Sequence, residues 1–173
     1  FAHSFTLSAN FHGGALLVNY PYDSNAAGSN VYTACPDDDL FIQQSLAYSV
    51  PNTPMYNSPS FPQGITNGAD WYVAYGAMQD WNYRWLGCNE VTIELSNIKQ
   101  PSTTQIETFW NENKESMTAY LETARWGVRG LVTDSQTGLP VAATVTVVGR
   151  DHDVYTDPDV GDYHRMLLDG TYE

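Results

Sequence analysis

The chain has 173 residues, of which 42% are hydrophobic and 13% aromatic. This composition predicts a packed globular protein rather than a disordered one, and the length allows one substantial core and part of a second. Acidic residues outnumber basic ones by 20 to 7. Because a negative protein repels a polyanion, the charge argues against nucleic-acid binding. No apolar run approaches the ~18 residues that span a bilayer.

Two further features of the sequence concern its ends and its cysteines. The chain starts at Phe1 without Met and ends at Glu173 directly after a strand-like run, so we expect a fragment of a longer protein. Cys35 and Cys88 could form one disulfide in a secreted protein or could be two small buried residues, and the sequence favours neither.

The first half of the chain alternates strand and helix signals. Residues 5–11 alternate polar and apolar side chains, which predicts a strand that carries His12 at its end. Residues 15–20 form a second strand-like run, and the polar residues 21–35 indicate a loop. Pro36 and the three aspartates after it are typical of a helix start.

That helix is expected to end near Tyr48, where a Pro-rich and Ser-rich stretch over residues 50–66 predicts a long loop. Residues 91–95 read as a buried strand, and residues 102–124 as an amphipathic helix closed by Gly127.

Short strands and turns follow the predicted helix. Residues 128–133 and 142–148 are strand-like and are separated by a turn at 136–138, which indicates a small β-sandwich. We therefore expect two domains, 1–126 and 127–173, with the second one truncated.

Two ionisable residues stand out before any comparison is made. Glu94 lies inside an otherwise apolar strand, and a buried carboxylate is costly unless it is paired or needed for function. His12 lies beside two glycines at a strand end. A structural ion pair or a solvent-facing position would explain Glu94 equally well, and a lone His is more often structural than a ligand.

Longer motifs surround these two residues. They are LSANFHGG (7–14), NYPYD (19–23), PDDDLF (36–41), GITNGADWY (64–72), MQDWNY (78–83) and EVTIEL (90–95). All six, in order, resemble zinc metallocarboxypeptidases, and most closely the regulatory subgroup with carboxypeptidases D, E, M and N. Residues 127–172 also resemble the transthyretin-like domain of that subgroup. The implied fold is the C-terminal part of a mixed-sheet α/β domain, followed by a small transthyretin-like β-sandwich.

The resemblance implies an exopeptidase that hydrolyses the C-terminal peptide bond with one zinc ion. His12 matches the third zinc ligand, and Glu94 matches the glutamate that takes a proton from the zinc-bound water. Tyr72 matches the tyrosine that closes over the terminal residue. Asp23 and Gln79 match the acidic and polar residues of the pocket for the terminal side chain, which implies removal of C-terminal Lys or Arg. A loop-capping role for Asp23 is the structural alternative.

The same resemblance implies peptide or protein C-termini, mainly basic, as partners and a secreted, extracellular or periplasmic location. The sequence departs from the family in one respect. The first two zinc ligands form a His-x-x-Glu pair, and no His in the chain, including His3, has Glu three residues later. The family's ligand set is that of carboxypeptidase A, so two of three protein ligands are expected outside this chain.

The arginines that hold the substrate carboxylate are also unmatched. We therefore expect the fragment alone to bind zinc poorly and to be inactive. The alternative is a non-catalytic, carboxypeptidase-like binding or scaffold module.

Overall fold

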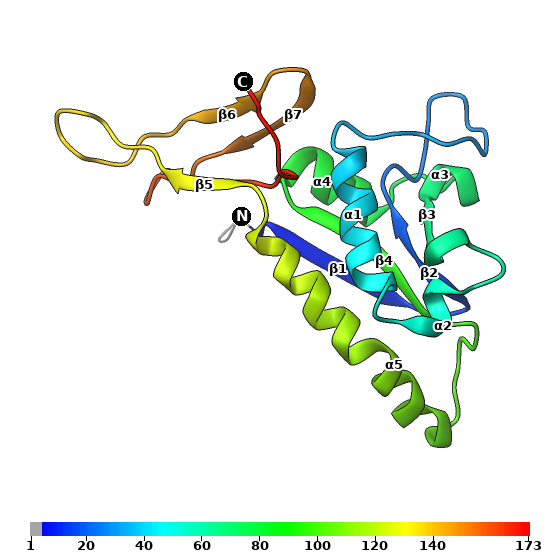
Figure 1. Cartoon of the computed structure of the whole chain (residues 1–173). Helices are drawn as coiled ribbons and strands as arrows, with labels where there is room; N and C mark the ends of the chain where they lie inside the picture. The colour runs from blue at the N-terminus through cyan, green and yellow to red at the C-terminus, as the bar shows by residue number, and fades with distance from the viewer. Residues whose placement is uncertain (1–4) are drawn as a thin grey trace.

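The structure, a computed structural model, describes residues 5–173, so His3 lies outside the described residues. Its first part contains β1 (Leu7–His12), β2 (Ala15–Tyr20), α1 (Asp38–Ser49), α2 (Thr53–Tyr56), η1 (Pro62–Gly64), β3 (Ile65–Asn67), α3 (Gly68–Trp71), α4 (Met78–Leu86), β4 (Asn89–Ser96), α5 (Thr103–Glu122) and η2 (Thr123–Arg125) (Figure 1). The second part contains β5 (Val128–Leu131), β6 (Thr144–Val147), β7 (Arg150–Tyr155) and β8 (Asp162–Arg165).

A four-stranded mixed sheet with the order β1-β4-β2-β3 organises the first part. β1 runs parallel to β4, β2 runs antiparallel to β4, and β3 runs parallel to β2. The prediction of a mixed-sheet α/β fold is confirmed. Because β1 and β4 are parallel neighbours, their carboxyl ends meet at one edge of the sheet, where α/β proteins place their sites.

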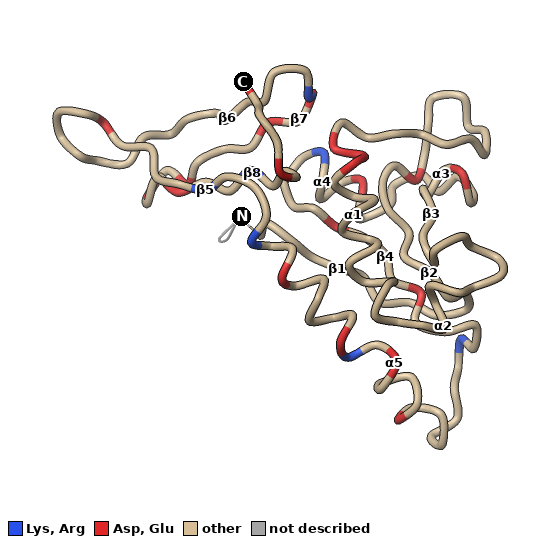
Figure 2. Tube along the Cα trace, viewed as in Figure 1, with Lys and Arg blue, Asp and Glu red and all other residues tan. Residues whose placement is uncertain are grey.

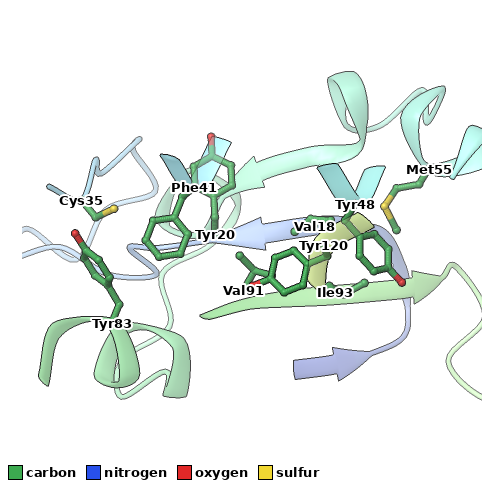
Figure 3. Close-up of a cluster of buried hydrophobic side chains, with 10 residues drawn as sticks. All are labelled: Val18, Tyr20, Cys35, Phe41, Tyr48, Met55, Tyr83, Val91, Ile93 and Tyr120. Carbon is green, nitrogen blue, oxygen red and sulfur yellow. The ribbon is translucent and has the colours of Figure 1, made fainter. Parts of the chain in front are cut away.

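One face of the sheet is apolar and is covered by α1 and α5. Val18, Val91 and Ile93 point from the strands toward Phe41, Tyr48 and Tyr120 of the two helices (Figure 3). Alternate strand residues point to opposite faces, so Glu90, Thr92 and Glu94 lie on the other face. The apolar face fixes the sheet against the helices, and the polar face is left for α4 and the site.

The strands β1, β2 and β4 and the helices α1 and α5 match their predicted ranges within a few residues, whereas the short helices and two elements beside the site, β3 and α4, were not predicted. β3 lies partly in the stretch predicted as loop; three residues are too short for periodicity to show, and the strand exists because β2 supplies its hydrogen bonds. α4 was missed because its buried side chains include Gln79 whereas Trp81 and Trp85 are 55% and 61% exposed, which inverts the usual amphipathic pattern.

Residues 128–165 form two antiparallel pairs, β5 with β8 and β6 with β7. Two of these strands, β5 and β6, were predicted, whereas β7 and β8 contain charged residues and carry no clear strand signal. The division into 1–126 and 127–173 and the transthyretin-like likeness stay predictions.

Three further features concern the charge, the membrane-spanning potential and the cysteines of the chain. Acidic residues outnumber basic ones along both parts of the chain (Figure 2). Within residues 5–173 there is no helix that has both the length and the apolar character for crossing a membrane. Cys35 and Cys88 are both buried free thiols. Of the two alternatives, the structure therefore shows two small buried residues and no disulfide between them.

Candidate active site

The carboxyl ends of β1 and β4 bring His12 and Glu94 together. The two residues lie opposite each other in the parallel pair, and Nδ1 of His12 lies 2.8 Å from Oε1 of Glu94. The imidazole is 53% exposed, whereas the Glu94 side chain is only 7% exposed. Oε2 of Glu94 is buried and has no hydrogen-bond partner among the described residues. Such an orphaned oxygen is costly in a folded protein unless a ligand or water completes it.

A pocket of about 160 Å³ opens beside this pair. It is lined by His12, Asn19, Asp23, Trp71, Tyr72, Ala74, Thr92 and Glu94. Four of the five predicted site residues therefore line one small cavity, and the fifth, Gln79, lies buried behind it. A larger cavity of about 520 Å³ between β4 and α5 is mainly apolar, contains His12 alone of the five, and holds no carboxylate. The smaller pocket is the candidate site.

Asp23 is the acidic residue of the pocket and is only 5% exposed. Its Oδ1 accepts hydrogen bonds from the side-chain amides of Asn19, at 3.1 Å, and Gln79, at 2.9 Å. Gln79 in turn accepts a hydrogen bond from the hydroxyl of Thr92 at 2.7 Å, which fixes the orientation of its amide. No side chain of residues 5–173 donates to Oδ2 of Asp23. That oxygen can accept from a bound cation.

A second carboxylate, Asp80 on α4, lies next to Asp23. The backbone N–H of Asp23 donates to both oxygens of Asp80, at 3.0 and 3.1 Å. Burial, together with the negative charge of Asp80, raises the pKa of Asp23 to about 7, although its two amide donors act in the opposite direction. Burial also raises the pKa of Asp80, to about 6. Within residues 5–173, neither Asp23 nor Asp80 forms a salt bridge with a basic side chain. A buried pair of carboxyl groups without a counter-charge favours a cationic ligand.

Tyr72 stands at the rim of the pocket. It is 50% exposed and packs edge-on against Trp71, with ring centroids 4.7 Å apart. Burial, and after it the negative charges of Glu94 and Asp23, raise the pKa of its hydroxyl. The side chain is thus neutral at ordinary pH and is exposed enough to move.

The donor set can be tested against zinc. The exposed imidazole of His12 suits zinc, and the carboxylate beside it suits a neighbouring base. However, a zinc site needs at least three protein ligands, and nowhere in residues 5–173 do three His, Cys, Asp or Glu side chains gather in a way that could hold a metal ion. The described residues therefore fit one part of a zinc site.

Asn19, Thr92 and Asp80 are site residues that the sequence reasoning did not single out. All three lie in the quoted motifs, Asn19 in NYPYD, Thr92 in EVTIEL and Asp80 in MQDWNY, but the motifs do not show what these side chains contact. The contact between Asp80 and Asp23 spans 57 residues and leaves no trace in local sequence.

Gly68 lies so close to Asp23 that a side chain has no room there. A Cβ atom at position 68 would lie 1.7 Å from Oδ1 of Asp23 and 2.8 Å from its Cα. We expect Gly68→Ala to displace Asp23 and to weaken binding of L-arginine by roughly 10- to 100-fold, measured by titration calorimetry on the full-length protein. Gly13→Ala is the control, because its Cβ would meet only ordinary contacts of 3.6 Å and more. Equal affinity in both variants would contradict the prediction.

Comparison with known proteins shows to which family the chain belongs. The family model of zinc carboxypeptidase matches residues 2–116. Carboxypeptidase D of Mus musculus is 43% identical over 99% of this chain and 13% of its own length. Carboxypeptidase SOL1 of Arabidopsis thaliana is 41% identical over 96% of the chain and 34% of its own length. The carboxypeptidase N catalytic chain of Homo sapiens is 40% identical over 98% of the chain and 39% of its own length.

The chain thus spans between 13% and 39% of the length of these relatives. The family model covers about two thirds of the chain, including β1, β4 and every residue that lines the pocket. The chain belongs to the zinc carboxypeptidase family.

Proposed function

We propose that the protein containing this chain is a zinc-dependent exopeptidase that hydrolyses the C-terminal peptide bond and prefers a terminal Lys or Arg. The single observation that carries the proposal is the pocket of about 160 Å³, in which His12, Glu94 and Asp23 line one cavity. A nitrogen donor, a carboxylate base and a buried acidic pocket residue are the three parts that this reaction needs from the chain.

In this proposal His12 is one zinc ligand, and the other two come from outside these 173 residues. When bound, zinc supplies a Lewis acid that polarises the scissile carbonyl and acidifies a water molecule. Glu94 accepts a proton from the attacking water and delivers it to the leaving amine. Its burial holds the carboxylate in place, and Oε2, which has no partner among residues 5–173, is the oxygen available for that proton.

Asp23 supports the choice of side chain. Its Oδ2 pairs with a terminal guanidinium or ammonium group, while Asn19 and Gln79 hold its Oδ1. A buried, charge-assisted pair of this kind discriminates strongly, because an apolar side chain would leave the carboxylate unpaired. Tyr72 would close over the terminal residue from the rim.

The wider setting is proposed on the family resemblance. Residues 127–173 are taken as part of a transthyretin-like β-sandwich, and peptide or protein C-termini as the substrates. A secreted, extracellular or periplasmic location is proposed on the same basis.

The test is an assay of the full-length protein on peptides that end in Arg, Lys or Phe, with and without a chelator. We expect release of Arg and Lys at least about 10²-fold faster than Phe, and loss of activity with the chelator. The isolated 173-residue chain, which provides one imidazole at the site, is expected to be inactive on all three peptides.

One result would overturn this proposal, and another would overturn only its preference for basic residues. No activity from the full-length protein would favour the alternative of a non-catalytic, carboxypeptidase-like binding or scaffold module. A preference for Phe would exclude the role given to Asp23 and leave the peptidase assignment intact.

A further inference from the structure

A buried carboxylate outside the pocket, Asp37, links the two parts of the chain. Asp37 precedes α1 and is fully buried. Its Oδ1 accepts a hydrogen bond from Arg150 at 2.9 Å and another from Arg165 at 2.8 Å. The proposed reaction uses none of these three groups, although burying them is costly.

The two arginines come from β7 and β8, more than 110 positions further along the chain. Arg165 is 1% exposed, and one of its nitrogens also donates to the carbonyl of Met166 at 2.8 Å. Arg150 also donates to both carboxylate oxygens of Asp39, at 2.7 Å each. Three of the four charged side chains in this cluster are mostly or wholly buried, so the contact is a fixed junction between the β-strands and α1.

The remaining oxygen of Asp37 holds α4. The hydroxyl of Tyr83 donates to Oδ2 of Asp37 at 2.9 Å and accepts from the backbone N–H of Asp37 at 3.1 Å. The Tyr83 ring is fully buried: His152 of β7 stacks on it, with ring centroids 4.0 Å apart, and Phe41 meets it edge-on at 5.0 Å. The ring and hydroxyl of Tyr83 are therefore held by both parts of the chain.

Tyr83 follows Gln79 by one turn of α4, so the two side chains share one face of the helix. Gln79 donates to Asp23, and Asp80, the next residue, accepts from the backbone of Asp23. A short helix is thus fixed at one end to the acidic pocket and at the other to the buried Asp37.

We propose that Asp37 and Tyr83 are positioning residues for the substrate pocket, and that Arg150 and Arg165 make the C-terminal strands part of that support. The two arginines orient the Asp37 carboxylate so that it accepts a hydrogen bond from Tyr83. Tyr83 in turn holds α4 in the position in which Gln79 and Asp80 contact Asp23. The inference deepens the proposed function, because it assigns a support to the pocket for the terminal side chain.

The test compares two tyrosines in the full-length protein. Tyr83→Phe keeps the ring and its stacking but removes the hydroxyl that reaches Asp37. Tyr48→Phe is the matched control: Tyr48 is also fully buried and donates one hydrogen bond, to Asn113 at 2.8 Å, away from the pocket. Both variants are expected to lower the melting temperature, Tyr83→Phe by more, because its hydroxyl forms two hydrogen bonds with Asp37 and that of Tyr48 forms one.

The readout is the dissociation constant of L-arginine, measured by titration calorimetry, with KM for a peptide ending in Arg alongside. We expect Tyr83→Phe to raise both by about tenfold with kcat within about twofold, and Tyr48→Phe to leave them within about twofold. Arg150→Gln, which removes the more exposed arginine and leaves Arg165 on Asp37, is expected to raise them by about threefold.

Unchanged arginine affinity in Tyr83→Phe, or an equal loss in Tyr48→Phe, would overturn the inference and leave the peptidase proposal untouched. A full-length protein that cleaves no peptide would overturn the peptidase proposal, and the arginine titrations would still decide the role of Tyr83. If the unaltered protein binds no arginine, the basic preference and the role of Tyr83 both fail, and the peptide assay alone decides the peptidase proposal.

Discussion

Glu94→Gln is expected to lower kcat of the full-length protein by roughly 10²- to 10⁴-fold on peptides that end in Arg. Gln has nearly the same shape and can still form a hydrogen bond with His12, but it cannot take a proton from water. L-arginine affinity should stay within about twofold, because Glu94 is not among the groups that bond to Asp23. Steady-state kinetics and arginine titration on the same preparations measure the two quantities.

Glu90→Gln is the matched control for this substitution. Glu90 lies on β4, on the same face as Glu94, and is 2% exposed. Its oxygens accept from Ser8, Asn10 and Asn82. Because a carboxamide meets these donors poorly, Glu90→Gln should lower stability while kcat falls less than about tenfold. Equal losses of kcat in the two variants would mean that Glu94→Gln acts through folding.

Asp23→Asn is expected to remove the preference for basic C-termini. We expect kcat/KM for peptides ending in Arg or Lys to fall by about 10²- to 10³-fold, because a buried cation would lose its counter-charge. Peptides ending in Phe should change by less than about threefold. Asp70→Asn is the control, since Asp70 is an exposed carboxylate two residues before Tyr72. A fall of the same size for Phe peptides would mean that the substitution damages the site as a whole.

The affinity for arginine should also depend on pH. With a pKa of about 7, Asp23 is mostly protonated below pH 7 in the empty pocket, and a protonated carboxyl cannot pair with a cation. Arginine affinity is therefore expected to fall about tenfold per pH unit between pH 6 and pH 5. Close to one proton should be released per arginine bound at pH 6, which calorimetry in buffers of different ionisation enthalpy detects. Affinity that is flat across this range would contradict the protonated state.

The same carboxyl makes the free energy of unfolding depend on pH. The pKa of Asp23 is raised from 3.8 to about 7 on folding, so the folded state binds more protons between those values. Its contribution to stability is therefore lost as pH rises from about 4 to 7. Burial lowers the pKa of His152 from 6.5 to about 4, which contributes in the opposite direction over much of the same window. Arginine binding is thus a cleaner test of Asp23 than thermal unfolding.

Much of the fold was predictable because it rests on local pattern. β2, β4 and α5 each carry enough apolar residues in a strand or helix period to be recognised, and the packed face of the sheet uses those residues. α4 and β7 were not predictable in this way. Their buried contacts are made by polar and charged side chains, such as Gln79 and Arg150, whose partners lie far away in sequence.

The residues of the candidate site also fall into a group that local sequence predicts and a group that it does not. His12 and Glu94 were flagged as ionisable residues at strand positions, and the motifs directed attention to Asp23, Tyr72 and Gln79. The 2.8 Å contact between His12 and Glu94 follows from the parallel pairing of β1 and β4, which topology decides and local sequence does not. Asp80 and Asp37 lie in two of the quoted motifs, but their roles were not predicted, because their contacts join residues that lie far apart in the sequence.

The junction at Asp37 has a consequence for how such a chain can evolve. A substitution at Asp37 would leave two arginines without their shared acceptor, and the loss of Arg165 would leave a fully buried carboxylate short of a counter-charge. Lineages that survive are therefore expected to change these positions together or not at all. A recombination event that exchanged the C-terminal strands for an unrelated module would carry away both cations. We therefore expect the two parts of the chain to be inherited together.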